Sequence, residues 1–529
     1  MQTQFPTYKL KQLNFSFFSI LLGIILRLQI FLENHSLWSD EALTVFKLIA
    51  YPFKKLITLT NSSHEAMHAY PIGFLFCIKK MIQLFGYSEY VFRATPLIFS
   101  IATLFIFSKL TKKIFKNIWS EVALFIFAIT GSQIYYASEL KPYTVDVFMM
   151  VLFLYLVLKY INKTINKNEY IFLGIIAGLS TTFSFAAPFI LGGLWFGGIA
   201  YCIHQNKKKH VFLFTKSAII WCTSFVLYYY FSIRFFNQNQ SLTRFWEYAF
   251  MPFDQGLWRS ISWIGSALFQ NFQNQLIVPA FFSSVFFLIG GVYLFLYEKK
   301  YFLIFISSII LTLFASALRL YPFIGRTTLF LCPVYLLIMV KGLECIWKSP
   351  LIYPNILIKR GLVFVVVTLT VVFNAQAIGS MQDNEDMRPI VKYFQEEYRP
   401  GDSVYISRVT QFSFGYYHGY YSMGSKPLLI GRIHFDYNDD VLQMMVQYVH
   451  ISFDKLGFMN GYLLGNRWKQ IAEKQKFIYK QNKRTWVIFS HYSQKEKKQI
   501  LYQFDQRGTQ VKALRKRGAE IYLYDFQKG

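Results

Sequence analysis

The sequence predicts a polytopic α-helical membrane protein with a soluble α/β domain at its C-terminal end. Of the 529 residues, 54% are hydrophobic, 20% are aromatic and 16% are charged, whereas a soluble domain carries about 25% charged residues. Apolar stretches long enough to cross a bilayer recur over the first 380 residues. From residue 381 the composition changes and short alternating stretches indicate strands. This composition excludes a disordered chain, a nucleic-acid-binding module and an ordinary cytosolic enzyme.

About eleven transmembrane helices are predicted, because stretches of about 18 apolar residues are typical of spanning helices. They fall at 15–32, 94–110, 120–136, 145–158, 170–185, 187–203, 211–231, 276–296, 302–317, 327–343 and 362–378. No small-residue cleavage site follows the first stretch, which favours a retained signal anchor. The segment 71–85 is short and interrupted by Lys79 and Lys80, so we interpret it as an interfacial helix.

The orientation follows from the basic residues, since cytoplasmic loops carry the excess of Lys and Arg. With 71–85 on the outer surface, every basic cluster of residues 1–380 falls inside. The N-terminus is then cytoplasmic, and the domain 381–529 lies outside, in the periplasm if the source is a bacterium with an inner membrane. Residues 1–380 hold 32 basic but 13 acidic residues, and nine of those acids lie on or next to external segments. We therefore expect the chemistry on the outer face.

The domain 381–529 is predicted to be a small α/β domain. An amphipathic helix at 386–398 precedes a strand at 403–407, and a strand at 485–490, a helix at 493–506 and a strand at 519–524 follow. Strands that alternate with helices are typical of this architecture. The five cysteines all precede this domain, so the sequence offers no disulfide framework or cysteine-based zinc site.

Two adjacent acids, Asp40 and Glu41, follow the first span within external juxtamembrane helices expected at about 34–93. Their neighbours Leu37, Trp38 and Ala42 are apolar or aromatic. Partial burial raises the basicity of a carboxylate, so this pair could supply a general base for a hydroxyl. On spacing alone, Ser39 or Asp40 could instead be the N-cap of a helix.

Charged residues also gather at other outer helix boundaries. Glu139 and Lys141 lie in a short turn between two spans, and Asp146 begins the next helix. Macrodipole compensation and snorkelling would explain these residues without any function. Arg93 and Arg326 each open a span, where an arginine can grip a phosphate with two donors. His64 and His68 share a helical face at i, i+4 and are weak candidates for a metal, since a catalytic site usually has three protein ligands.

The order of these elements resembles the GT-C glycosyltransferases, close to protein O-mannosyltransferases and the aminoarabinose transferase of lipid A. The resemblance rests on the acidic pair after Trp38, on His68–Ala69–Tyr70–Pro71, on Phe85–Gly86 with Glu89 and Arg93, on Tyr136–Ala137–Ser138–Glu139–Leu140–Lys141–Pro142–Tyr143, and on Gly325–Arg326 with Pro333. It covers about the first 345 residues. The family's His motif commonly has paired prolines, whereas this chain has Tyr70–Pro71.

The resemblance implies an inverting transfer of a sugar from a polyprenyl-phosphate donor to an acceptor outside the membrane. Asp40 would be the base, with Glu41 in support. Lys141, Arg93 and Arg326 would bind the donor phosphate, while Glu139, Asp146, His68 and Tyr143 would orient sugar or acceptor. The acceptor would be a protein, a lipid or a cell-envelope glycan, and membrane lipids would surround the enzyme. No nucleotide, nucleic acid or other certain cofactor is implied, and metal dependence varies within the superfamily, so a divalent metal stays open.

Two other classes remain open. A lipid-linked sugar transporter would place charges along a path through the membrane and often shows a two-fold repeat. An O-antigen ligase or polymerase would place its key Arg and His residues in a large late loop. Here the acids lie in the first external loop and no repeat is visible, which favours the glycosyltransferase.

Overall fold

The computed structural model describes residues 7–59, 70–163, 166–234, 245–276, 279–349, 361, 368, 372, 385–399, 402–406, 410–422, 484–490, 492 and 494–526. The chain divides into two compact units. We call Met1–Asn34 with Ile57–Met381 the membrane unit, and His35–Leu56 with Gln382–Gly529 the C-terminal unit. The segment that carries Asp40 therefore groups with the end of the chain.

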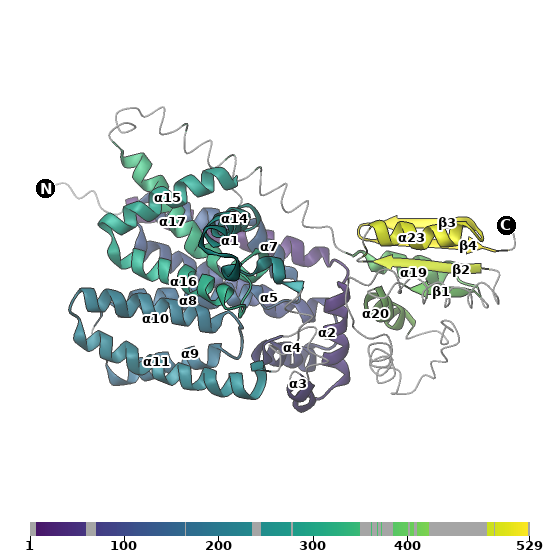
Figure 1. The fold of residues 1–529 in the computed structure, drawn as a ribbon, viewed down its shortest axis with the longest axis horizontal. Helices are drawn as coiled ribbons and strands as arrows, with labels where there is room; N and C mark the ends of the chain where they lie inside the picture. The colour runs from purple at the N-terminus through teal and green to yellow at the C-terminus, as the bar shows by residue number, and fades with distance from the viewer. Residues whose placement is uncertain are drawn as a thin grey trace. The chain divides into compact units, whose positions relative to one another are not determined.

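The described part of the membrane unit is helical (Figure 1). Its longer helices are α1 (Thr7–Glu33), α4 (Ile72–Phe85), α5 (Glu89–Ile114), α6 (Ile118–Ala128), α8 (Tyr143–Tyr160), α9 (Lys167–Ser180), α10 (Ala187–His204), α11 (Lys208–Tyr228), α14 (Leu257–Gln275), α15 (Ala280–Tyr297), α16 (Lys299–Ala317) and α17 (Cys332–Lys348). Short helices are α7 (Gly131–Tyr135), η2 (Tyr136–Ser138), η3 (Tyr229–Ile233), η4 (Glu247–Ala249), η5 (Phe253–Gln255) and η6 (Gly325–Leu331), and α3 (Phe53–Leu59) contains the boundary at residue 56. The helices α9 and α11 lie side by side, as do α10 and α16.

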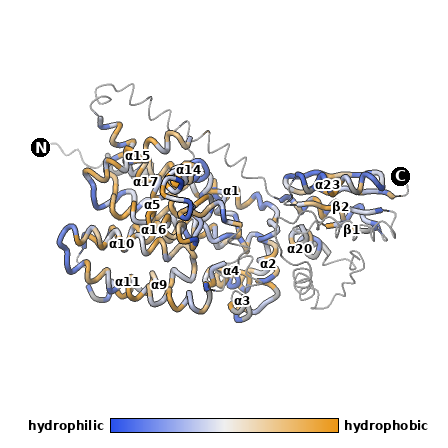
Figure 2. Tube along the Cα trace, viewed as in Figure 1, coloured by the Kyte–Doolittle hydropathy of each residue, from blue (hydrophilic) through white to orange (hydrophobic). Residues whose placement is uncertain are grey.

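Eight helices of the described residues are long and apolar enough to cross a membrane, and Figure 2 shows the apolar residues along them. They account for eight of the eleven predicted spans. The stretch 120–136 is a pair of helices, Ile118–Ala128 and Gly131–Ser138, bent by 53°. The stretch 170–185 gives only the shorter apolar helix Asn168–Ser180, and 362–378 lies almost wholly outside the described residues. The polytopic helical fold is confirmed, while the number of spans in the described residues is eight, or nine with the bent pair.

A buried arginine holds the bend between α6 and α7. Arg27 of α1 donates from Nη1 to the carbonyl of Ala128 at 2.8 Å, the last residue of α6, and from Nε to Ser100 Oγ at 2.8 Å. The broken helix leaves carbonyls without their intrahelical donors, and no bilayer water can replace them. Arg27 supplies a donor from a neighbouring helix.

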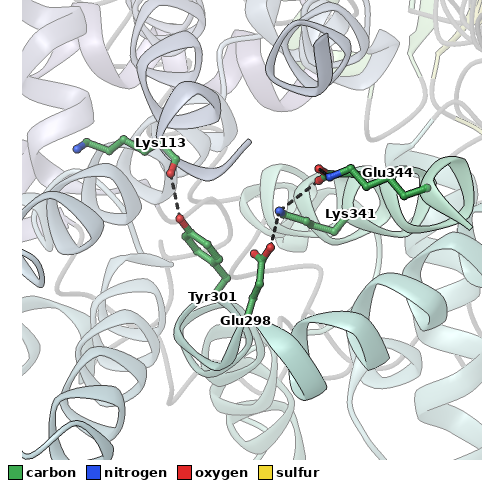
Figure 3. A network of polar contacts seen from close by, with 6 residues as sticks. Lys113, Glu298, Tyr301, Lys341 and Glu344 are labelled. Atoms are coloured by element: carbon green, nitrogen blue, oxygen red, sulfur yellow. Dashed lines mark hydrogen bonds and ion pairs between the residues drawn. The ribbon is translucent and has the colours of Figure 1, made fainter. Parts of the chain in front are cut away.

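Charged side chains also join other helices of the membrane unit. Figure 3 shows Lys341 of α17 between two carboxylates, those of Glu298 at 2.9 Å and Glu344 at 3.2 Å. Beside it, the Tyr301 hydroxyl donates to the carbonyl of Lys113 at 2.9 Å. A buried charge is tolerated when it is paired in this way, so this network ties α17 to the junction of α15 and α16.

The C-terminal unit contains a four-stranded sheet in the order β1–β2–β4–β3. Its strands are β1 (Ser403–Ile406), β2 (Arg484–Ser490), β3 (Thr509–Lys516) and β4 (Ala519–Asp525), with β1 parallel to β2 and the other pairs antiparallel. The helices α2 (Ser39–Ala50), α19 (Met387–Glu397), α20 (Thr410–Ser422) and α23 (Gln494–Asp505) complete the described part. The α/β class is confirmed; β3 was not predicted, because both of its faces are largely exposed.

Two glycines allow α15 and α17 to touch backbone to backbone. A Cβ added at Gly290 would overlap the carbonyl of Ile338, and one added at Gly342 would overlap the carbonyl of Phe286. Small residues at such contacts let membrane helices approach closely.

We expect Gly290→Ala to destabilise the membrane unit by about 1–3 kcal/mol, the usual cost of overpacking. The adjacent Gly291→Ala is the matched control, because its Cβ would meet nothing within 4 Å. Thermal unfolding of both purified variants in detergent checks this. An equal melting temperature for the two variants would contradict the close contact.

Candidate functional site

The predicted residues of the membrane unit gather where α7 ends and α8 begins. After η2 the chain turns through Glu139 to Lys141, where the amide of Lys141 donates to the carbonyl of Glu139 at 2.7 Å. Both side chains are buried, and Lys141 is only 8% exposed. Its ammonium lies 5.4 Å from the centroid of the Tyr70 ring, which attracts a cation to its face. The short turn therefore presents a buried cation beside a buried carboxylate.

Arg326 reaches the same place from a distant part of the sequence. It follows Gly325, whose φ of +75° favours glycine. Its guanidinium lies 6.0 Å from the Tyr143 ring and 5.6 Å from the Trp246 ring. The Tyr143 ring in turn lies 5.1 Å from that of Tyr136.

Tyr136 marks the centre of this group. The charges of Arg326, Lys141 and Glu139 all act on its hydroxyl, and the Tyr143 ring lies near both Arg326 and the Tyr136 ring. The two cations are therefore within electrostatic range of one hydroxyl, although Arg326 is far away in the sequence. The same turn leads into the N-terminus of α8, where the helix dipole favours an anion. We call Tyr136, Glu139, Lys141, Tyr143 and Arg326 the cationic cluster.

Asp146 lies beside the cationic cluster, one turn into α8. Its carboxylate is buried, and among the described residues no hydrogen-bond partner meets its Oδ1. Its charge acts on Tyr321. Burial first, and then the charge of Asp146, raise the pKa of Tyr321 well above its usual value. Tyr321 therefore stays a neutral hydroxyl, which donates to the carbonyl of Thr327 at 2.9 Å.

Arg93 is buried near the start of α5, a helix that packs against both η2 and α8. A hydrogen bond of 3.1 Å from Thr144 Oγ1 to the carbonyl of Pro96 joins the beginnings of α8 and α5. Arg93 thus belongs to the same helix ends, one turn from a direct link to α8.

Asp40 and Glu41 lie in the C-terminal unit, in the first turn of α2. The N-cap is Trp38 and makes no side-chain cap, so the alternative of Ser39 or Asp40 as the N-cap is wrong. Glu41 performs the capping instead, since its Oε2 accepts from the amide of Trp38 at 3.1 Å. Glu41 is fully buried, whereas Asp40 is half-buried.

Residues 385–417 hold the segment before α2, and no pattern in the sequence had indicated this role. The amide of Ser39 donates to Glu385 Oε2 at 3.1 Å, and the amide of Leu37 donates to the Tyr417 hydroxyl at 2.6 Å. Ser36 Oγ donates to Asp386 Oδ1 at 2.9 Å. A carboxylate at a helix N-terminus is favourable, so these contacts order the turn that carries Asp40.

A metal centre is not supported by the described residues, in which no group of three or more His, Cys, Asp or Glu side chains could hold an ion. The predicted candidates His64 and His68 lie in 60–69, outside the described residues.

The class that the fold and the site define is an integral membrane protein of many apolar helices, with the buried cations Lys141 and Arg93 near its helix ends. ArnT from Cupriavidus metallidurans, solved with undecaprenyl phosphate, is similar over 97% of this chain and 97% of its own, at a TM-score of 0.53 and 10% identity. This likeness confirms the predicted resemblance for the fold.

Archaeal oligosaccharyltransferases are more distant. AglB from Archaeoglobus fulgidus, solved with an inhibitory peptide and a dolichol-phosphate, gives a TM-score of 0.46 at 10% identity, over 96% of this chain and 74% of its own. The Archaeoglobus fulgidus oligosaccharyltransferase solved with Zn and sulfate gives 0.43 at 12% identity, over 76% of this chain. The chain spans 61% of that protein's length. No family model and no curated protein matches the sequence.

We expect Tyr417→Phe to loosen the segment before α2, because the buried amide of Leu37 loses its acceptor at a cost of about 1–3 kcal/mol. Hydrogen exchange of residues 36–41 in the full chain should become faster. Tyr492→Phe is the matched control, since its hydroxyl donates to Glu520 instead. Unchanged exchange in Tyr417→Phe would show that this hydrogen bond does not hold the segment.

Proposed function

We propose that this protein is an inverting glycosyltransferase that moves a sugar from a polyprenyl-phosphate donor to an acceptor on the outer face of the membrane. The observation that carries the proposal is that Lys141 and Arg326 both lie within electrostatic range of Tyr136, in a chain with the fold of a protein solved with undecaprenyl phosphate. A buried lysine and a half-buried arginine at membrane helix ends suit a phosphate whose lipid tail stays in the bilayer.

In this proposal the cationic cluster and Arg93 bind the donor. Lys141 contributes a point charge, and Arg326 offers a planar set of donors that matches phosphate oxygens. The rings of Tyr136 and Tyr143 provide apolar faces for the sugar. Glu139 and Asp146 accept hydrogen bonds from sugar or acceptor hydroxyls, and His68 assists in orienting them.

Asp40 acts as general base and Glu41 supports it by holding the first turn of α2. The acceptor hydroxyl gives its proton to Asp40 while its oxygen forms a bond to the anomeric carbon. The bond from that carbon to the phosphate oxygen breaks, and polyprenyl phosphate leaves on the opposite face. One attack from behind the leaving group inverts the configuration. A phosphate leaving group held by cations needs no general acid, so one carboxylate is sufficient.

The proposed setting is a bacterial plasma membrane, with the N-terminus in the cytoplasm and the C-terminal domain outside. The acceptor is a protein, a lipid or a cell-envelope glycan. The C-terminal domain helps to select this acceptor, with its basic residues near anionic lipid headgroups. Mass spectrometry of envelope glycans from a deletion strain identifies the transferred sugar.

We expect Asp40→Asn to lower transfer by at least about 100-fold, the usual contribution of a general base, because an amide cannot take the acceptor proton. The glycan restored to the deletion strain by each variant is the measurement. Asp254→Asn is the control, since Asp254 is exposed and forms an ion pair with the equally exposed Arg319 at 3.4 Å. Near-normal transfer by folded Asp40→Asn would contradict the base assignment.

We expect Lys141→Met to weaken binding of undecaprenyl phosphate to the purified full chain by about 10-fold or more. A hydrogen bond to a charged group contributes about 1.5–3 kcal/mol, and 1.4 kcal/mol corresponds to a factor of ten. Lys80→Met is the matched control, because Lys80 also lies over a ring, that of Phe76, but is exposed. If both variants bind undecaprenyl phosphate equally, Lys141 has no part in phosphate binding.

A further inference from the structure

A buried asparagine of α14 closes the turn that precedes Arg326. Asn271 donates from Nδ2 to the carbonyl of Phe323 at 2.9 Å, and its Oδ1 accepts from the amide of Gly325 at 3.0 Å. The hydroxyl of Thr328 donates to the same Oδ1 at 3.1 Å. One fully buried amide thus holds both ends of the left-handed turn at Gly325.

Gln275, one helical turn later, extends this contact to the other side of the cationic cluster. Its Nε2 donates to the carbonyl of Gly325 at 2.9 Å and to Thr328 Oγ1 at 2.8 Å. Its backbone carbonyl accepts from Ser132 Oγ of α7 at 3.0 Å. Because α7 runs directly into η2 and the turn of Lys141, Gln275 touches both segments that bring cations to Tyr136.

Apolar side chains would hold these segments together at a lower cost in desolvation free energy. Burying four polar side chains costs free energy unless each finds partners, and a satisfied network gains directional contacts that apolar side chains lack. What this network determines is the place of the Gly325 turn, and so of Arg326, relative to α7. The geometry therefore favours a role in setting the distance between Arg326 and Lys141.

We infer that Asn271 and Gln275 are positioning residues that hold Arg326 and the Lys141 turn at the spacing a donor phosphate requires. This inference rests on the proposed function. Neither residue touches the reacting atoms; each acts through Arg326. Binding of the phosphate, rather than the chemical step at saturating donor, is the property they control.

The test is Gln275→Met, which keeps the length of the side chain and the backbone link to Ser132 but removes both amide hydrogen bonds. Undecaprenyl phosphate binding to the purified full chain should weaken about 5- to 20-fold, in line with two lost hydrogen bonds. In the deletion strain's membranes, kcat at saturating donor should change less than about 3-fold. Gln273→Met, on the exposed side of the same helix, is the matched control and should bind normally.

A double-mutant cycle with Arg326→Met separates positioning from general stability. If Gln275 acts through Arg326, Gln275→Met should weaken binding by less than about 2-fold once Arg326 is Met. Full additivity of the two substitutions would overturn the inference, as would normal binding by Gln275→Met alone. Normal binding by Arg326→Met would instead overturn the phosphate-binding role in the proposed function, so the two failures are distinct.

Thr328 supplies a second route if Gln275→Met does not fold. Thr328→Val is isosteric and removes only the hydroxyl shared by Asn271 and Gln275, so it should weaken binding by about 3- to 10-fold. Thr328→Ser keeps the hydroxyl and should restore binding. Equal binding by the Val and Ser variants would overturn the inference.

Discussion

The membrane unit depends on one constraint, which is that a bilayer offers no water to a broken helix. The chain stops α6 at Ala128 and restarts at Gly131, and Arg27 meets the carbonyl that this break exposes. The break redirects the chain through η2 into the turn of Lys141. The direction of α7, and with it the place of the cationic cluster, thus depends on a buried arginine from α1 that lies outside the cluster.

The fold was predictable where its signal is local. Apolar length alone identified eight spans that the structure contains, since a helix in lipid satisfies its own backbone. The bend within the stretch 120–136 was not predicted, because hydropathy carries no information about the angle between two helices. The strand β3 was not predicted because an edge strand that is exposed on both faces needs no alternation of apolar and polar residues. The lysines of β3 (Lys512 and Lys516) are typical of an edge protected against pairing with another chain.

The site was predictable only in part, for the same reason. Glu139, Lys141 and Asp146 stand within eight positions of one another, so their grouping was visible in the sequence. Gln275 and Glu385 look like ordinary polar residues there, because the atoms they bind lie 50 or 346 positions away. The two acids of the pair have different roles, which the sequence did not indicate. Glu41 caps α2, whereas the carboxylate of Asp40 is not part of this cap.

Two cations within electrostatic range of Tyr136 also suit the charge change of the proposed reaction. The donor is a phosphodiester with one negative charge, whereas the product polyprenyl phosphate is a monoester that carries about −1.5 to −2 at pH 7. As the sugar leaves, negative charge grows on the phosphate, and Lys141 and Arg326 would hold this phosphate in the bound donor and in the leaving group alike. Glu139 offsets part of the positive charge. Without that offset the cluster would hold the more negative product tightly and slow its release, so a buried carboxylate beside two cations serves turnover as well as orientation.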